Sequence, residues 1–421
     1  MAVFFAAMFA AAAQAICEGQ NRPTLKKQAS SSPADLRVGF VELVDAAPLV
    51  AALELGYFAD EGLRVVLDRE IGWGNVRDKL VYGHLQAGHA LVGMPPLSVL
   101  GRSRFPEVLT SIMALGAGGN AITFGRRLTD AGITSAADLA RYAHSKPAPV
   151  PVLLAHVFDC SMHHYLLREW LAQGGVNMES NVRFCVLPPN QMTRQLGRGT
   201  LDGFCCGEPW NTLAEQEGLG QIVAATTEVL PDHPEKVLAV SRRWLASSGP
   251  AAEALIRATI RGCAYCADAA NYPALAEMLA KPAYLHMRED IVLKSLTIDR
   301  WLGGASRKAS GPIRNCSPAM TFPAATHGAW ILSQMARWNH LSGDIDPVAV
   351  ALEAVNSGPY RRAAAALGIA CPPDDLPPMR LRTGWYSPKA PLHATQPKIP
   401  GARPIEDDAE KTSRAVARQG A

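Results

Sequence analysis

The sequence predicts an α/β fold with enough chain for two lobes. Short apolar runs typical of strands alternate with helical patterns between residues 36 and 240, which indicates a largely parallel sheet with helices on both sides. From Pro250 the pattern changes to long helices. Of the 421 residues, 48% are hydrophobic and 19% are charged, an ordinary composition for a globular protein with a sizeable core.

The first part of this region alternates regularly. Strands are expected at residues 36–43, 63–69, 89–94, 108–115 and 121–124. A helix is expected over residues 47–61, with Pro48 in its first turn. A second helix is expected after the glycine-rich turn at residues 72–74, with Asn75 as its N-cap.

The stretch from Cys160 to Lys236 carries most of the functional signal. Three times a strand pattern stops at Pro, Gly or a capping residue and a helical pattern follows. We therefore expect three helix N-termini near one sheet edge, where they would attract anions. Around this stretch we expect helices at 136–144, 251–270 and 327–338 and strands at 149–157 and 237–240.

The two ends of the chain carry different signals. Residues 1–15 have an apolar centre of signal-peptide length and end in A-Q-A, which fits a cleavage site, but they lack a positive n-region, so a misplaced start is the alternative. Residues 18–35 are polar and predict a tether. From Pro372 to Ala421 the chain is rich in Pro, Arg and Lys, which predicts a disordered or surface-hugging tail.

The net charge and the cysteine content indicate which partners the protein can bind and which compartment it can occupy. The net charge is +3, the basic residues are scattered, and no zinc-finger or RNA-binding motif is present, so we expect no direct nucleic-acid binding. The nine cysteines are an odd number without a regular framework, which favours a reducing compartment. The signal-like leader favours export, so both compartments stay open.

Five residues at strand-to-helix junctions offer the groups that a small planar anion needs: a cation, an imidazole, an amide, a backbone N–H and an aromatic face. They are Lys236, His163, Asn120, Gly207 and Trp73. Each alone has a structural interpretation, such as a capping or core histidine, a packing tryptophan, a solvated turn lysine or a glycine that starts a helix. The prediction therefore depends on their combination. No nucleophile, base and orienting group accompany them, so we expect no enzyme.

Several motifs together resemble one family, the nitrate-binding proteins of ABC importers (the NrtA/CmpA family, which includes NasS-type nitrate/nitrite sensors). The similar segments run in order from about residue 36 to 240: A-P-L-V-A-A-L-E-L-G-Y-F-A-D-E-G-L, W-G-N-V-R-D-K-L-V-Y-G, H-A-L-V-G-M-P, N-A-I-T, H-H-Y-L-L-R-E-W-L-A-Q-G-G, L-P-P-N-Q-M, D-G-F-C-C-G-E-P-W-N and H-P-E-K-V-L-A-V. A weaker similarity extends to Y-R-R-A-A-A-A-L-G-I near Tyr360.

The resemblance implies a two-lobed, clamp-like (type II) periplasmic-binding-protein fold that holds one oxyanion between its lobes. Residues 36–130 and 237–371 would form lobe 1, and residues 131–236 lobe 2. The family pattern places the anion contacts on Trp73, Asn120, His163, Gly207 and Lys236. No metal or other cofactor is implied.

The resemblance also implies the ligand. Asn120 replaces the usual glutamine of the nitrate importers, and Cys206 the commoner valine. The bicarbonate branch has a carboxylate near the lysine position and uses calcium, so Lys236 favours nitrate or nitrite. Nitrate only accepts hydrogen bonds, so we expect a site of donors without a nearby free carboxylate.

The family resemblance favours a periplasmic importer component that works with ABC permease subunits. Three other functions remain open. A cytoplasmic sensor that releases an antiterminator partner is the main alternative. Bicarbonate binding and a thiamine-pyrimidine-synthase-like enzyme are weaker ones, because adjacent Cys205 and Cys206 should point to opposite sides of a strand and Cys263 and Cys266 fit an apolar helix core.

Overall fold

The structure is a computed structural model. It describes residues 35–101, 107–145, 150–297, 300–301, 308–309, 320–341, 345–382 and 384–388. The signal-like leader and the tether up to residue 34 lie outside the described residues. Among the residues that are described, no helix has both the length and the apolar character needed to cross a membrane.

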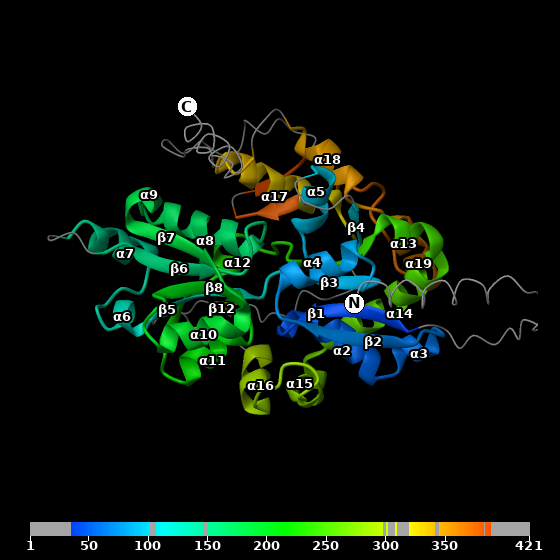
Figure 1. The fold of residues 1–421 in the computed structure, drawn as a ribbon, viewed down its shortest axis with the longest axis horizontal. Coiled ribbons are helices and arrows are strands. Elements are labelled where there is room, and N and C mark those ends of the chain that lie inside the picture. The colour runs from blue at the N-terminus through cyan, green and yellow to red at the C-terminus, as the bar shows by residue number, and fades with distance from the viewer. Residues whose placement is uncertain are drawn as a thin grey trace, which may run out of the picture. The chain divides into compact units, whose positions relative to one another are not determined.

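The first sheet has five strands in the order β2-β1-β3-β10-β4. Strands β1, β2 and β3 of this sheet lie side by side in Figure 1. Its strands are β1 (Leu36–Val41), β2 (Val65–Glu70), β3 (Ala87–Leu91), β4 (Leu109–Ala114) and β10 (Lys236–Ser241). Strand β1 pairs in parallel with β2 and β3. Strand β10 runs antiparallel to β3 and β4.

The second sheet also has five strands, in the order β7-β6-β8-β5-β9. They are β5 (Asn120–Gly125), β6 (Val152–His156), β7 (Val182–Val186), β8 (Gly203–Gly207) and β9 (Gly220–Ala225). Strand β6 is parallel to β7 and β8, whereas β5 is antiparallel to β8 and β9. The prediction of largely parallel sheets is therefore wrong for β5 and β10, because each enters its sheet from the other sheet and runs against its neighbours.

The chain crosses between the sheets twice, and the two crossing segments lie side by side. Ala117 and Pro234 form an antiparallel bridge, and the Gly118 N–H donates to the His233 carbonyl at 2.9 Å. The first crossing ends at Asn120, before the expected lobe boundary at residue 130, because β5 pairs within the second sheet. The rest of the lobe assignment stays a prediction.

Helices cover both sheets. In the first two thirds of the chain they are η1 (Val44–Ala46), α2 (Ala47–Glu54), α3 (Tyr57–Asp60), α4 (Trp73–Val81), α5 (Met94–Val99), α6 (Arg126–Thr129), α7 (Ala136–Ala143), α8 (Met162–Gln173), α9 (Met178–Asn181), α10 (Pro189–Gly197), α11 (Trp210–Gln216), α12 (Thr226–Val229), α13 (Arg242–Ser247) and α14 (Gly249–Ala267). Beyond them follow η2 (Ala269–Asn271), α15 (Tyr272–Ala280), α16 (Glu289–Thr297), the short pair β11 (Arg300–Trp301) and β12 (Lys308–Ala309), α17 (Ala325–Arg337), α18 (Pro347–Glu353) and α19 (Gly358–Ala366).

Two local predictions differ from the structure. The helix expected over residues 47–61 is split into α2 and α3, because Gly56 between them adopts a left-handed conformation with φ of 76°. Helix α4 begins at Trp73 with Gly72 as its N-cap, so Asn75 lies inside the helix and the expected cap is wrong. The earlier start moves Trp73 into the first turn.

Two apolar clusters hold these elements together. One packs the face of β1 that carries Val38 and Phe40 against α2, α14, α15 and α19. The other contains side chains of both sheets, such as Val41 and Phe204, together with Trp330 of α17. The regions around the two sheets therefore share a continuous apolar contact.

For the first part of the predicted tail, the disordered alternative is wrong and the surface-hugging one agrees with the structure. Strands β13 (Met379–Leu381) and β14 (Gly384–Tyr386) form a hairpin whose Met379 and Tyr386 side chains are buried. The Pro377 carbonyl accepts a hydrogen bond from Thr326 Oγ1 at 2.6 Å, which ties the hairpin to α17. A few apolar residues thus order this Pro-rich segment, and residues 389–421 lie outside the described residues.

Candidate functional site

The five residues singled out by the sequence come together where the crossing segments meet the helix N-termini. Trp73 is the first residue of α4, and His163 lies in the first turn of α8. Asn120 begins β5, Gly207 ends β8, and Lys236 begins β10. The Lys236 Nζ lies 5.3 Å from the centre of the Trp73 ring, and the Trp73 and His163 rings are 6.2 Å apart.

This cluster is buried and rich in polar atoms without hydrogen bonds. The exposed fractions are 0% for His163, 1% for Trp73 and Lys236, and 4% for Asn120. Buried polar atoms without a hydrogen-bond partner among the described residues include Trp73 Nε1, Asn120 Oδ1 and both ring nitrogens of His163. Because buried polar groups in folded proteins are nearly always hydrogen-bonded, such a concentration indicates a ligand site.

Gly207 contributes space. A Cβ atom added at this residue would lie 3.3 Å from the Leu43 methyl carbons and 3.4 Å from Asn120 Oδ1, closer than most such contacts. Asn211 of α11 donates to the carbonyl of neighbouring Cys206 at 2.9 Å, which helps to fix the end of β8. The lack of a side chain at residue 207 therefore lets the strand end approach the Asn120 amide closely.

The structure also places two carboxylates in the cluster, where the sequence predicts no nearby free carboxylate; both are paired with Lys236. Lys236 Nζ lies 2.8 Å from Asp45 Oδ2 and 3.2 Å from Glu235 Oε1. Glu235 further accepts a hydrogen bond from Asn120 Nδ2 and lies 3.5 Å from His163 Nδ1. Glu235 itself is 2% exposed.

The position of Glu235 follows from the crossing segments. The bridge between Ala117 and Pro234 sets the second crossing beside the first, so Glu235 faces Asn120. Glu235 precedes β10, and the alternation of side chains along a strand therefore does not turn it away from Lys236. Both residues stand in the H-P-E-K motif, so the sequence shows that they are neighbours in the chain. Strand alternation alone, however, predicts that the Glu235 and Lys236 side chains lie on opposite faces.

Asp45 and His89 form a second layer of the cluster. Asp45 lies in η1, just before α2, and its Oδ1 is 2.9 Å from His89 Nε2 on β3. On the other side of the site, the Thr226 hydroxyl donates to the Asn120 carbonyl at 2.9 Å and lies 2.8 Å from His233 Nε2. Sequence reasoning missed these residues. His89 and His233 stand in two of the family-like segments, but only the fold brings them together with Asp45 and Thr226.

The ionisation of the cluster is set by burial and by Lys236. Burial raises the pKa of Glu235 to about 7, partly offset by Lys236 and by the Asn120 hydrogen bond. Burial opposes ionisation of Asp45 too, but Lys236 and His89 outweigh it and hold its pKa well below the ordinary value. Burial lowers the pKa of Lys236, yet Asp45 and Glu235 raise it more, so this lysine is a cation.

The two histidines nearest Glu235 are neutral. Burial lowers the pKa of His163 well below its ordinary value, and Lys236 lowers it further. Burial lowers the pKa of His233 to about 4. The cluster can thus offer a fixed cation, neutral imidazole and indole N–H groups and an amide to an anion, but its two carboxyl groups oppose one.

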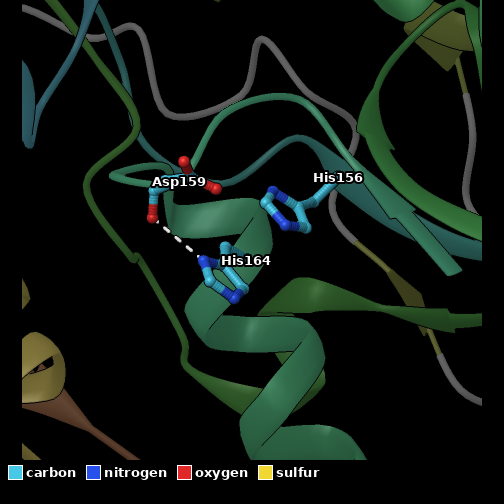
Figure 2. Close-up of side chains that lie close together, drawn as sticks. All are labelled: His156, Asp159 and His164. Carbon is cyan, nitrogen blue, oxygen red and sulfur yellow. Dashed lines mark hydrogen bonds between the residues drawn. The ribbon is translucent and has the colours of Figure 1, made fainter. Parts of the chain in front are cut away.

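A second group of side chains, His156, Asp159 and His164, lies where the end of β6 meets the start of α8 (Figure 2). The two imidazole rings are stacked, with centres 4.0 Å apart and planes at 2°. A metal ion lies in the plane of each imidazole that binds it, so two parallel rings do not direct their lone pairs at one ion. His164 already uses Nδ1 on the Asp159 carbonyl at 2.9 Å and Nε2 on Arg168 Nε at 2.6 Å. We therefore assign no metal to this group.

The cysteines that raised the enzyme alternative are packing residues. Cys205 and Cys206 are both buried in β8, and they belong to apolar clusters on opposite sides of the second sheet. Cys263 and Cys266 of α14 are buried in the apolar cluster of the first sheet. The positions of both pairs match the sequence prediction: Cys205 and Cys206 point to opposite sides of a strand, and Cys263 and Cys266 lie in an apolar helix core.

Comparison with known proteins gives the family and the fold. Residues 29–280 match the NMT1-like family. The crystal structure of the periplasmic nitrate-binding protein NrtA from Synechocystis PCC 6803 is similar with a TM-score of 0.77 at 26% identity, over 86% of this chain and 98% of that one. The expected two-lobed periplasmic-binding-protein fold is confirmed.

Two curated relatives differ in size and in described ligand. The nitrate/nitrite binding protein NrtA of Synechococcus elongatus is 31% identical over 79% of this chain and 77% of that protein. The bicarbonate transport ATP-binding protein CmpC of the same species is 33% identical over 80% of this chain but only 50% of that protein. The chain thus spans half the length of the latter relative.

Proposed function

The chain belongs to the NMT1-like family, and on that premise we propose that it binds a small oxyanion, nitrate or nitrite, as the substrate-binding component of an ABC-type importer. Its similarity to NrtA proteins over most of both chains supports this substrate class. Trp73, Asn120, His163, Gly207 and Lys236 are the proposed ligand contacts, and no catalytic role is proposed.

One observation carries the proposal. A buried lysine lies beside the Asn120 amide and among indole and imidazole nitrogens that have no hydrogen-bond partner among the described residues, at the junction of the two sheets. A small trigonal anion could accept hydrogen bonds from several of these groups while it pairs with the Lys236 charge. The same enclosure keeps water from screening that pairing.

Bicarbonate is a second candidate, favoured by Glu235. Nitrate accepts hydrogen bonds only, whereas bicarbonate also has an O–H group that could donate to a carboxylate. The Glu235 carboxyl lies within the cluster, 3.2 Å from Lys236 Nζ. Asp45 supplies a further carboxylate, whose Oδ2 lies 2.8 Å from this nitrogen.

The compartment decides the biological role. We propose a periplasmic location and ABC permease subunits as partners, by analogy with the periplasmic NrtA. The alternative is a cytoplasmic sensor that controls an antiterminator. Fractionation of the native host with detection of the mature N-terminus separates the two, because a periplasmic chain lacking the first residues supports the importer.

Calorimetric titration of protein that has been unfolded, dialysed and refolded tests the ligand. We expect saturable binding of nitrate or nitrite at one site, with or without calcium. Bicarbonate, titrated with and without calcium, is the matched comparison. Binding of bicarbonate alone would replace the nitrate proposal by its alternative, and binding of none of the three anions would contradict the proposed site.

A further inference from the structure

The Glu235 carboxyl group is close to the side chains that are proposed to donate hydrogen bonds to the oxyanion. Its carboxyl group accepts from Asn120 Nδ2 and lies 3.5 Å from His163 Nδ1 and 3.2 Å from Lys236 Nζ. These are three of the five proposed anion contacts. A carboxylate, like nitrate, is planar and presents oxygen acceptors, so the side chain and the anion compete for one set of donors.

The charges of the cluster make this competition costly. Asp45 and Glu235 are two carboxyl groups facing one cation, Lys236. With both carboxyls ionised, a bound monoanion would leave three negative charges and one positive charge in a buried site. Uncompensated buried charge is strongly unfavourable, so one negative charge must be neutralised for the anion to bind well.

We propose, resting on the function proposed above, that the oxyanion binds together with one proton, which is taken from solvent by the Glu235 carboxylate. The new O–H bond forms on Glu235, the buffer acid or hydronium ion that supplies the proton loses its bond to it, and no bond of the oxyanion changes. The incoming negative charge and the incoming proton cancel, so the net charge of the cluster stays constant. The neutral carboxyl leaves the Lys236 charge to the anion and can itself donate a hydrogen bond.

The surroundings of Glu235 allow this proton uptake near neutral pH. Burial places the pKa of Glu235 at about 7. The other titratable groups that face it keep their charge between pH 5.5 and 8.5: the pKa is raised for Lys236 and Cys205, and it is lowered for Asp45, His163 and His233. His89 pairs with Asp45 Oδ1, whereas Lys236 pairs with Asp45 Oδ2.

Proton linkage sets the expected pH dependence. Below the pKa of Glu235 the carboxyl is already neutral, and the Kd for nitrate is constant. Above that pKa, binding must take up a proton, so the Kd rises about tenfold per pH unit. At pH 8.5 the Kd is therefore expected to be about 30-fold higher than at pH 5.5.

The experiment is calorimetric titration with sodium nitrate at pH 5.5 and 8.5, each in two buffers of different ionisation enthalpy, which gives Kd and the number of protons taken up. Wild type is compared with Glu235→Gln and with Glu61→Gln, a control whose carboxylate pairs with Arg257 far from the site. We expect wild type and the control to take up about one proton at pH 8.5 and almost none at pH 5.5. Glu235→Gln should show one Kd and no proton uptake at both values.

Each result decides the proposal. A wild-type Kd that does not change with pH, with no proton taken up, overturns the coupling while leaving nitrate binding intact. The same pH dependence in Glu235→Gln assigns the proton to another group and also overturns it. If the variant does not fold, the wild-type proton count decides alone. No wild-type binding at either pH would defeat the proposed function and this inference with it.

Discussion

At the scale of single residues, Lys236 is the centre of the electrostatics. It is the cation among the five proposed contacts, and both Asp45 and Glu235 pair with it. Its pairing with Asp45 means that the lysine charge is partly balanced before any anion arrives. The remaining attraction for an anion therefore depends on the state of Glu235.

Replacement of Lys236 by Met keeps much of the side-chain volume and removes the charge. We expect nitrate binding to weaken by about 2–4 kcal/mol, because a buried anion would lose its counter-charge. This corresponds to a roughly 30- to 1000-fold higher Kd in calorimetric titration. Lys281→Met is the control, since Lys281 pairs with Glu54 at a partly exposed position.

The control should retain the wild-type Kd. Because Lys236→Met leaves Asp45 and Glu235 without their cation, its folded fraction must be checked by circular dichroism at the titration temperature. Wild-type nitrate affinity in folded Lys236→Met would exclude Lys236 as a ligand contact.

At the scale of elements, most strands and helices could be predicted from hydrophobic periodicity and capping signals. Residues 36–43 and 89–94 were expected as strands, and the structure has β1 and β3 there. The wrong predictions concern features that depend on tertiary structure. The direction of strands β5 and β10 depends on which sheet the chain enters. The two-residue alternation of apolar side chains along a strand carries no information about this choice.

The residues of the candidate site also divide into those that sequence signals mark and those that only the fold brings together. Trp73, His163 and Gly207 stand at turns or helix starts that sequence signals mark, so a motif could point to them. Asp45 and His89 come together only because η1 and β3 are neighbours in the fold. Glu235 was visible in its motif, yet only the bridge between the crossing segments shows that it faces Asn120.

The stacked histidines at the start of α8 predict acid sensitivity. Burial lowers the pKa of His156 to about 4, and Arg168 contributes to this. The folded state thus resists protonation while the unfolded state takes up the proton. Stability from this group is fully present above about pH 6.5 and is lost as the pH falls towards 4.

The variant His156→Phe removes this titration and keeps a ring in the stack. Between pH 7 and 4.5 its unfolding free energy, measured by urea denaturation, should fall less than that of wild type by about 2–3 kcal/mol. Glu235 contributes with the opposite sign in both proteins, so it cancels in the comparison. Equal losses in the two proteins would show that His156 does not resist protonation in the fold.

At the scale of the whole molecule, the site depends on contacts that join the regions around the two sheets. The Glu42 carbonyl at the end of β1 accepts from Trp210 Nε1 of α11 at 2.8 Å, and Val44 N–H donates to the Glu208 carbonyl at 2.8 Å. Asn190 of α10 donates to Glu42 Oε2 at 3.0 Å. These bonds enclose the cluster, since they join segments next to Asp45 and Gly207.

Such an arrangement suits a protein whose ligand stabilises a closed form. An anion held by Lys236 and Trp73 from one sheet and by Asn120, His163 and Gly207 from the other would add direct links between the two regions. A ligand that binds the closed form more tightly shifts the population towards it. In the proposed importer, that closed form is the state that a permease recognises.

The most direct test of this account is a crystal structure of the protein grown with nitrate at pH 5.5. We predict one planar anion within hydrogen-bond distance of Lys236 Nζ, His163 and Asn120, beside the Trp73 ring and the Gly207 backbone, with the Glu235 carboxyl moved off Lys236. An anion bound elsewhere, or a Glu235–Lys236 contact unchanged beside a site without nitrate, would contradict it.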